Sequence, residues 1–256
     1  MDKRELPVGV FDSGVGGISV LREMVRLMPE ENFYFFGDSV HAPYGTKSLE
    51  EIRALTLKNV ADMAGKGIKA IVVACNTATS AAITLLRQVY TEIPVVGIEP
   101  ALKPAVMEKQ EARVLVLATP MTVGANKFQS LMHRYESQAT VIPVGCPGLM
   151  EYVENGKLEG EEVETYLKEL LSPYLTEKLD AVVLGCTHYP FLKKAIQNVI
   201  GPGPHIIDGS AGTARELRRR LIQMDLKRDG QKKGHVIFEE SIPEKIALCR
   251  YLLERQ

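Results

Sequence analysis

The chain has 256 residues and a formal net charge of −1; 45% of its residues are hydrophobic and 25% are charged. This composition is typical of a globular protein with a packed core. The chain lacks the large positive charge that would favour binding to nucleic acid or to an anionic membrane. No apolar run approaches the roughly 20 residues that span a bilayer, and the N-terminal residues lack the apolar core of a signal peptide. We therefore expect a cytoplasmic protein.

The first predicted unit is a short strand at residues 8–11, a glycine-rich turn and a helix at residues 18–27. The turn reads Asp12-Ser13-Gly14-Val15-Gly16-Gly17. Its glycines would let the backbone approach a ligand, and the helix start offers free N–H groups to an anion. No Gly-Lys-Ser/Thr follows, so the turn is not a Walker loop. The alternative is that Asp12 or Ser13 simply caps the helix.

A second strand at residues 32–36 runs into a loop that contains Pro43-Tyr44-Gly45. Ser48 and Glu51 then form a capping box at the start of an amphipathic helix. Tyr44 could line a ligand pocket, but the loop alone favours an aromatic side chain that packs on the surface.

A third strand, at residues 70–73, ends at a cysteine followed by small polar residues, Cys75-Asn76-Thr77-Ala78, before a predicted helix at 80–90. The same pattern returns at 181–184, followed by Cys186-Thr187-His188-Tyr189-Pro190. The two cysteines lie 186 − 75 = 111 residues apart. Ligands of open parallel α/β sheets bind at the carboxyl ends of strands, which is where both thiols fall.

The first strand and its turn also recur, because residues 113–118 and the segment after them echo residues 8–17. The offset from Asp12 to Ala118 is 106, close to that between the cysteines. We interpret the chain as a degenerate duplication in which an apolar residue replaces Asp12 in the second copy.

The remaining elements continue the alternation of strands and helices. Strands are expected at 93–98, 140–144, 205–207 and, as an edge strand, 235–238; helices at 101–107, around Glu151 and Glu154, at 163–174, after 208–212 and at 241–253. The last helix has a predicted Ser241–Glu244 capping box, and Cys249 lies on its apolar stripe. An arginine run at 218–220 is interpreted as a solvated helix face. The alternation predicts an α/β fold of two mainly parallel sheets that face each other.

Such a fold would place Cys75 and Cys186 across one cleft. A lone buried cysteine is usually inert, but a thiol beside a helix start can have a lowered pKa and act as a base or nucleophile. Thiol hydrolysis needs one thiol, a base and an oxyanion hole. Two bases on opposite faces of one carbon fit stereoinversion instead, in a dry and well-ordered pocket. No Cys-x-x-Cys pair or metal-ligand cluster is present, so no metal is expected.

Four pieces together closely resemble the glutamate racemases: Asp12 to Gly17, Pro43-Tyr44-Gly45, Cys75 to Ala78, and Gly185 to Pro190. The resemblance covers essentially the whole chain. It implies a cofactor-independent, two-base racemase that makes D-glutamate for peptidoglycan, with glutamate as its small-molecule substrate. It also implies a homodimer and two similar domains, residues 1–98 with 208–256 and residues 99–207, with the active site between them.

The resemblance also implies roles for single residues. Cys75 should deprotonate D-glutamate with help from Asp12, and Cys186 should deprotonate L-glutamate with help from His188. The family's further acidic residue falls on Glu154, eight positions after Cys146, rather than on Glu151. The remaining expected contacts hold the ammonium and α-carboxylate (Ser13, Asn76, Thr77 and Thr187) or the side-chain carboxylate (Pro43, Tyr44 and Gly45).

One departure is the segment Ala118-Thr119-Pro120-Met121-Thr122, where many members read Gly-Thr-x-Gly-Thr. Ligand contacts from this turn are therefore left open, as are oligomer geometry, allosteric regulation and the extent of domain opening. Three other functions also stay open: a racemase of aspartate or a hydantoin, a non-catalytic amino-acid-binding protein, and a thiol hydrolase that needs only one cysteine.

Overall fold

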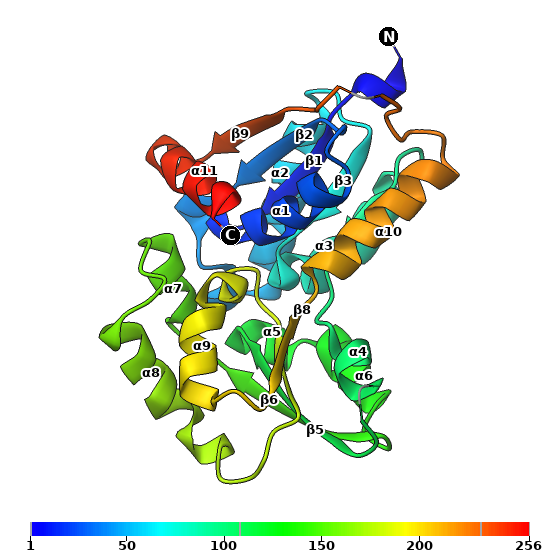
Figure 1. Cartoon of the computed structure of the whole chain (residues 1–256). Coiled ribbons are helices and arrows are strands. Elements are labelled where there is room, and N and C mark those ends of the chain that lie inside the picture. Colours follow the sequence, from blue (N-terminus) through cyan, green and yellow to red (C-terminus); the bar gives the residue numbers. More distant parts are fainter. Residues whose placement is uncertain (1, 108, 231, 256) are drawn as a thin grey trace.

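The structure is a computed structural model that describes residues 2–107, 109–230 and 232–255. Two parallel sheets lie one above the other (Figure 1), with strand orders β4-β3-β1-β2-β9 and β6-β5-β7-β8. The five-stranded sheet contains β1 (Val8–Asp12), β2 (Phe33–Gly37), β3 (Ala70–Val73), β4 (Val95–Gly97) and β9 (Val236–Glu240). The four-stranded sheet contains β5 (Ala112–Ala118), β6 (Ala139–Gly145), β7 (Ala181–Leu184) and β8 (His205–Asp208). The predicted α/β class is confirmed.

The topology confirms the predicted duplication. Within each half, the strand that comes first in sequence pairs with the second and the third, and the third pairs with the fourth. The five-stranded sheet adds β9 beside β2 at its edge, as predicted. Asp12 and Ala118 therefore end equivalent strands, and Cys75 and Cys186 follow equivalent strands.

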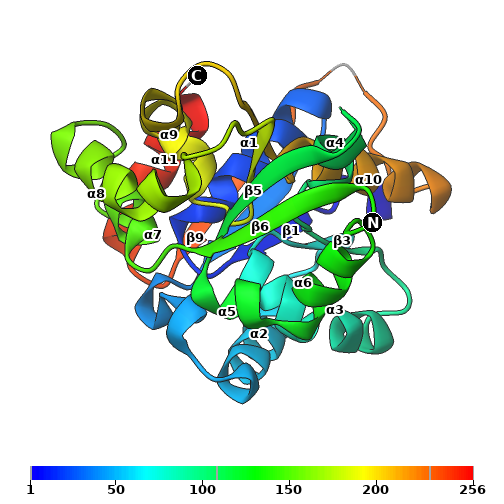
Figure 2. The ribbon, with the colours of Figure 1, turned by 90° about the horizontal axis from the view of Figure 1, so that it is seen from below.

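Helices cover both faces of each sheet (Figures 1 and 2). On the five-stranded sheet, α1 (Ile18–Leu27), α10 (Ser210–Gln223) and α11 (Ile246–Glu254) cover one face, and α2 (Leu49–Ala64) and α3 (Asn76–Val89) the other. On the four-stranded sheet, α7 (Leu149–Glu154), α8 (Glu161–Leu171) and α9 (Lys193–Ile200) cover one face, and α4 (Leu102–Met107) and α6 (Asn126–His133) the other. The short helix α5 (Pro120–Gly124) contacts α3. The 3₁₀ turns are η1 (Lys3–Glu5), η2 (Val15–Gly17), η3 (Ser39–His41), η4 (Tyr44–Thr46), η5 (Ser172–Tyr174), η6 (Tyr189–Leu192) and η7 (Pro243–Lys245).

The strands are apolar at successive positions, rather than at alternate ones, because both faces of each sheet are covered by helices. Val10 and Phe11 are both fully buried, but they belong to different apolar clusters because successive side chains point to opposite faces. One cluster contains both Val10 of β1 and Leu115 of β5, so it runs continuously from one sheet to the other. Burial of this shared surface holds the two sheets together.

Two predicted helix starts are wrong. The helix after β3 begins at Asn76 rather than at 80, because Cys75 serves as its N-cap and its sulfur accepts a hydrogen bond from the Ala78 N–H (3.4 Å). The final helix begins at Ile246, and the Ser241–Glu244 box is absent. Ser241 Oγ instead accepts from the Val40 N–H (2.9 Å), and η7 occupies the intervening turn. The Ser48–Glu51 capping box is confirmed.

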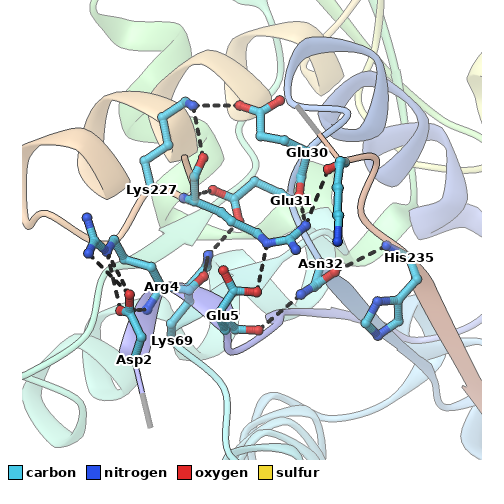
Figure 3. A network of polar contacts seen from close by, with 11 residues as sticks. Asp2, Arg4, Glu5, Glu30, Glu31, Asn32, Lys69, Lys227 and His235 are labelled. Carbon is cyan, nitrogen blue, oxygen red and sulfur yellow. Dashed lines mark hydrogen bonds and ion pairs between the residues drawn. The ribbon is translucent and has the colours of Figure 1, made fainter. Parts of the chain in front are cut away.

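A buried polar network fastens the segment between α10 and β9 to the amino ends of the strands (Figure 3). Lys69 and Glu31 form an ion pair in which neither side chain is exposed. Glu31 also accepts from the Arg228 N–H (2.7 Å), and Asn32 accepts from the His235 N–H (3.2 Å). These bonds fix where the chain returns to the five-stranded sheet.

The exposed face of α10 and the hydropathy of the helices bear on two predictions from the sequence. The arginines at 218–220 are exposed, as predicted for a solvated helix face. Across residues 2–107, 109–230 and 232–255, no helix combines the length and the hydropathy that crossing a bilayer requires.

Candidate active site

Side chains from the two sheets meet where the strands end. Thr187 Oγ1, which follows β7, donates to Asp12 Oδ2 at the end of β1 (3.0 Å). Ser19 Oγ donates to the Thr187 carbonyl (2.8 Å). The Val15 N–H donates to Glu154 Oε1 (2.9 Å). These bonds hold the Cys186 motif and Glu154 against the glycine-rich turn and the helix that follows it.

Cys75 lies in an acidic, buried environment. Its Sγ is 3.2 Å from Ser13 Oγ, and its residue is 5% exposed. Burial, reinforced by the charge of Asp12, raises the pKa of the Cys75 thiol to about 12. Burial likewise raises the pKa of Asp12 to about 6, although hydrogen bonds from Thr187 and the Gly14 N–H (3.0 Å) oppose this. Cys75 therefore carries its proton at neutral pH.

Asp12 does not hydrogen-bond the Cys75 sulfur. Its two carboxylate oxygens accept from the Gly14 N–H and from Thr187 Oγ1. Any help that it gives to Cys75 is therefore electrostatic in this arrangement, through its charge on the thiol.

Cys186 lies beside a cation instead. Its Sγ is 3.6 Å from His188 Nδ1, and His188 Nε2 is 2.6 Å from Glu154 Oε1. Burial opposes a charged imidazole, but the bonds with Cys186 and Glu154 outweigh it and raise the His188 pKa well above its ordinary value. Burial would also raise the pKa of Glu154, but hydrogen bonds from His188 and Lys245 lower it to about 2. A protonated His188 stabilises negative charge on the Cys186 sulfur.

Glu154, and not Glu151, contacts His188, and it does so from the end of α7. It is also bound by the Val15 N–H and by Lys245. Lys245 is a contact that the sequence reasoning missed. Its position at the end of η7 depends on how the C-terminal segment returns, and no local motif signals it.

The glycines of the first turn make room for side chains of the second half. A Cβ atom at Gly14 would lie 2.1 Å from Glu154 Oε1, and one at Gly16 would lie 2.4 Å from His188 Nδ1. The space that these glycines leave beside the backbone is occupied by the side chains of Glu154 and His188. The turn is therefore part of the contact between the two halves.

Polar groups that could hold an amino acid surround Cys75. Both polar side-chain atoms of Asn76 are buried and have no hydrogen-bond partner among the described residues. Thr77 Oγ1 lies 3.1 Å from both Thr119 Oγ1 and Thr122 Oγ1. Thr119 and Thr122 lie in the turn whose ligand contacts the sequence left open. Thr119 caps α5, accepting from the Thr122 N–H (3.2 Å).

The loop of Pro43, Tyr44 and Gly45 adjoins this threonine cluster. Tyr44 is 1% exposed and its hydroxyl donates to Asp38 Oδ2 (2.6 Å), so the prediction of a surface aromatic is wrong. The Pro43 carbonyl accepts from Thr46 Oγ1 (3.1 Å). A Cβ atom at Gly45 would lie 2.9 Å from the Thr119 Cβ. That this loop binds a side-chain carboxylate stays a prediction.

The other two cysteines are core residues. Cys146 and Cys249 are buried, and burial raises the pKa of both thiols. All four cysteines are free thiols. Among the residues that the structure describes, no group of three or more His, Cys, Asp or Glu side chains is placed to hold a metal ion.

Comparisons with known proteins agree with this arrangement. The sequence profile of the family "Asp/Glu/Hydantoin racemase" matches residues 8–217. A glutamate racemase of Clostridium botulinum is 50% identical over 256 residues, which cover 99% of each chain. The crystal structure of a glutamate racemase isoform from Bacillus anthracis has a TM-score of 0.86 at 32% identity, covering 98% of this chain and 94% of that one. A glutamate racemase from Francisella tularensis in complex with D-glutamate has a TM-score of 0.85 at 28% identity, covering 99% and 95%.

Proposed function

The chain belongs to the Asp/Glu/hydantoin racemase family, and we propose that it interconverts L- and D-glutamate without a cofactor. Its similarity to glutamate racemases over nearly their whole length supports glutamate as the substrate. The product D-glutamate would supply peptidoglycan synthesis. We further propose a cytoplasmic homodimer.

One observation carries the two-base mechanism: two buried thiols follow equivalent strands but have opposite electrostatic surroundings. Cys75 lies beside the carboxyl group of Asp12, which favours the protonated thiol. Cys186 lies beside the imidazole of His188, whose raised pKa places a positive charge next to the Cys186 sulfur. A resting enzyme with one proton donor and one proton acceptor is what conversion of L-glutamate to D-glutamate requires.

In that direction the Cys186 thiolate removes the α-proton of L-glutamate, and the electron pair of the C–H bond is delocalised into the α-carboxylate. The Cys75 thiol then donates its proton to the opposite face of the carbon. Cys186 is left protonated and Cys75 ionised, which is the starting state for D-glutamate. Burial of both thiols keeps water away from the carbanion.

The polar groups between the sheets would hold the amino acid in place. Asn76, Thr77, Ser13 and Thr187 would bind its ammonium and α-carboxylate groups, and the unpartnered side chain of Asn76 supports this most directly. We assign Thr119 and Thr122 to the same task, because both already contact Thr77. Pro43, Tyr44 and Gly45 would line the pocket for the side-chain carboxylate.

We also propose that residues 1–98 with 208–256 form one domain and residues 99–207 the other. The bonds between Asp12 and Thr187, and between Val15 and Glu154, join these two parts directly at the site.

Serine substitutions test the mechanism. Cys75→Ser and Cys186→Ser should each lower kcat/KM for racemisation by about 10²–10⁴-fold, as expected when a general acid–base group is lost. Each variant should still eliminate HCl from a 3-chloroglutamate of the enantiomer that its remaining cysteine deprotonates, because elimination needs one base. The assay is polarimetry for racemisation and chloride release for elimination.

Cys249→Ser, which changes a buried thiol outside the proposed pair, is the matched control. Full racemisation by either test variant would rule out two bases. No racemisation by the wild type, together with hydrolytic activity that only one of the two substitutions abolishes, would instead favour a thiol hydrolase. Activity of the wild type on aspartate or a hydantoin but not on glutamate would move the proposal to a related racemase.

A further inference from the structure

Lys245 belongs to the segment that returns to the five-stranded sheet, yet it contacts Glu154, which comes from the other half. It lies at the end of η7 and forms an ion pair with Glu154 Oε2. Its side chain is 22% exposed and that of Glu154 is 8% exposed. Resting on the proposed function, we propose that Lys245 is a positioning residue for the Cys186 base, acting through Glu154 and His188.

Lys245 is linked to Cys186 by a series of contacts through Glu154 and His188. Glu154 Oε1 faces His188 Nε2 (2.6 Å) and accepts from the Val15 N–H (2.9 Å), while Oε2 is held by Lys245. With both oxygens held, the carboxylate has one orientation, and it fixes the imidazole with Nδ1 directed at Cys186. Substituting Lys245 would free one oxygen and let the carboxylate turn.

Two of the groups that hold Glu154 come from outside its own sheet. The Val15 N–H belongs to the turn after β1, and Lys245 belongs to the segment between β9 and α11. Glu154 and His188 come from α7 and from the turn after β7. The Cys186 base is therefore completely assembled only while the two halves are in contact.

Charge gives Lys245 a second effect. The thiolate, imidazolium, carboxylate and ammonium alternate in sign along the contact chain, so the charged set sums to zero. Other titratable groups face it from neighbouring elements: Asp12 of β1, Cys75 before α3, Cys146 after β6, Tyr189 of η6, Glu240 of β9 and Cys249 of α11. All of these are neutral or negative. Without Lys245 the set carries a net negative charge beside the reacting sulfur of Cys186.

The variants are Lys245→Met, which keeps the length of the side chain without its charge, and Lys245→Arg, which keeps the charge. Lys194→Met is the matched control, because Lys194 pairs with Glu159 (2.7 Å) at an exposed position. Each is assayed for kcat and KM and for the α-deuterium isotope effect on kcat/KM, starting from L-[α-²H]- and from D-[α-²H]-glutamate. Lys245→Met is also combined with Glu154→Gln.

We expect Lys245→Met to lower kcat about tenfold with a smaller change in KM, and Lys245→Arg to restore most of the loss. Because the step at Cys186 becomes slower, the isotope effect should rise with L-glutamate and fall with D-glutamate. A general structural defect would change both alike. In the Glu154→Gln background the lysine substitution should have little further effect. Equal changes in both directions, or a Lys245→Met variant that behaves like Lys194→Met, would overturn the proposal.

The wild type is measured first, since its failure to racemise glutamate would refute the proposed function rather than the role of Lys245. In that case the ¹⁵N resonances of His188, titrated with pH in wild type and in Lys245→Met, test the role without turnover. A change in the His188 titration is expected. An unchanged titration would overturn the role of Lys245.

Discussion

At the scale of single residues, the site depends on different surroundings for two identical side chains. Cys75 and Cys186 follow equivalent strands, yet one lies beside a buried carboxyl group and the other beside an imidazole held by Glu154. The duplication supplied two similar positions, and their neighbours make them chemically unequal.

Asp12 illustrates a cost of this chemistry in stability. Burial raises its pKa from 3.8 to about 6, so the folded chain binds a proton that the unfolded chain has already lost. The free energy of unfolding therefore falls as pH rises from about 4 to about 6, and the loss persists above that range. Asp12→Asn should stabilise the protein at pH 8 by about 1–3 kcal/mol, since one pKa unit corresponds to about 1.4 kcal/mol, while racemisation is lost.

Urea unfolding of wild type and Asp12→Asn between about pH 3 and pH 8 measures this difference. It should shrink as pH falls from about 6 to about 3, because below pH 3.8 Asp12 is mostly protonated in both states. Asp62→Asn, at an exposed carboxylate paired with Lys58, is the control for removing a carboxylate from the surface. A variant that is less stable at pH 8, or a difference that does not vary with pH, would contradict the account.

Most site residues could be found from the sequence because they stand in motifs at strand ends. Cys75, Cys186 and His188 lie within a few residues of their strands, so local pattern determines where they point. Lys245 could not be found, because its contact joins residues 91 positions apart and depends on the path of the returning segment. Tyr44 was misjudged because its partners, Asp38 and Asn59, become visible only when the loop packs on α2.

At the scale of elements, the strands were predictable and the helix boundaries less so. Apolar runs bounded by turn residues identify the buried strands of a parallel sheet. The start of α3 was misplaced because a cysteine is not an expected cap, and polar Asn76 and Thr77 resemble a turn. Helix α6 was missed altogether. Only one of its residues, Phe128, is buried, so its apolar stripe is weak.

The Lys69–Glu31 pair gives a prediction for the contact between elements. Lys69→Met leaves Glu31 buried without its cation, and loss of one partner of a buried pair typically costs about 3–5 kcal/mol. Lys69→Met with Glu31→Met should recover much of that loss, although the Arg228 N–H then loses its acceptor. Lys58→Met, at an exposed pair, is the control and should change stability by less than about 0.5 kcal/mol.

Urea unfolding at a single pH compares these variants. If Lys69→Met were within about 1 kcal/mol of wild type, an effect far below that expected for a broken buried pair, then Glu31 and Lys69 would not hold the returning segment as described.

At the scale of the whole molecule, two sheets that share the order of four equivalent strands face each other through one continuous apolar cluster and a few polar contacts. The duplication could be inferred from the sequence, because two strand-and-turn units recur at similar offsets. The contact between the two halves could not be inferred from the sequence. It depends on Gly14 and Gly16, whose missing side chains leave room for Glu154 and His188. This meeting joins fold and function, because it brings one thiol from each half to a shared site.

The most direct test of this account follows L-glutamate with the purified wild type in deuterium oxide, without added cofactor, by circular dichroism and mass spectrometry. The account predicts that the optical signal decays to zero. Early D-glutamate should carry deuterium at the α-carbon, while the remaining L-glutamate keeps its proton, because different thiols remove and return it. Deuterium that enters recovered L-glutamate as fast as product, or no decay at all, would contradict a racemase with two bases.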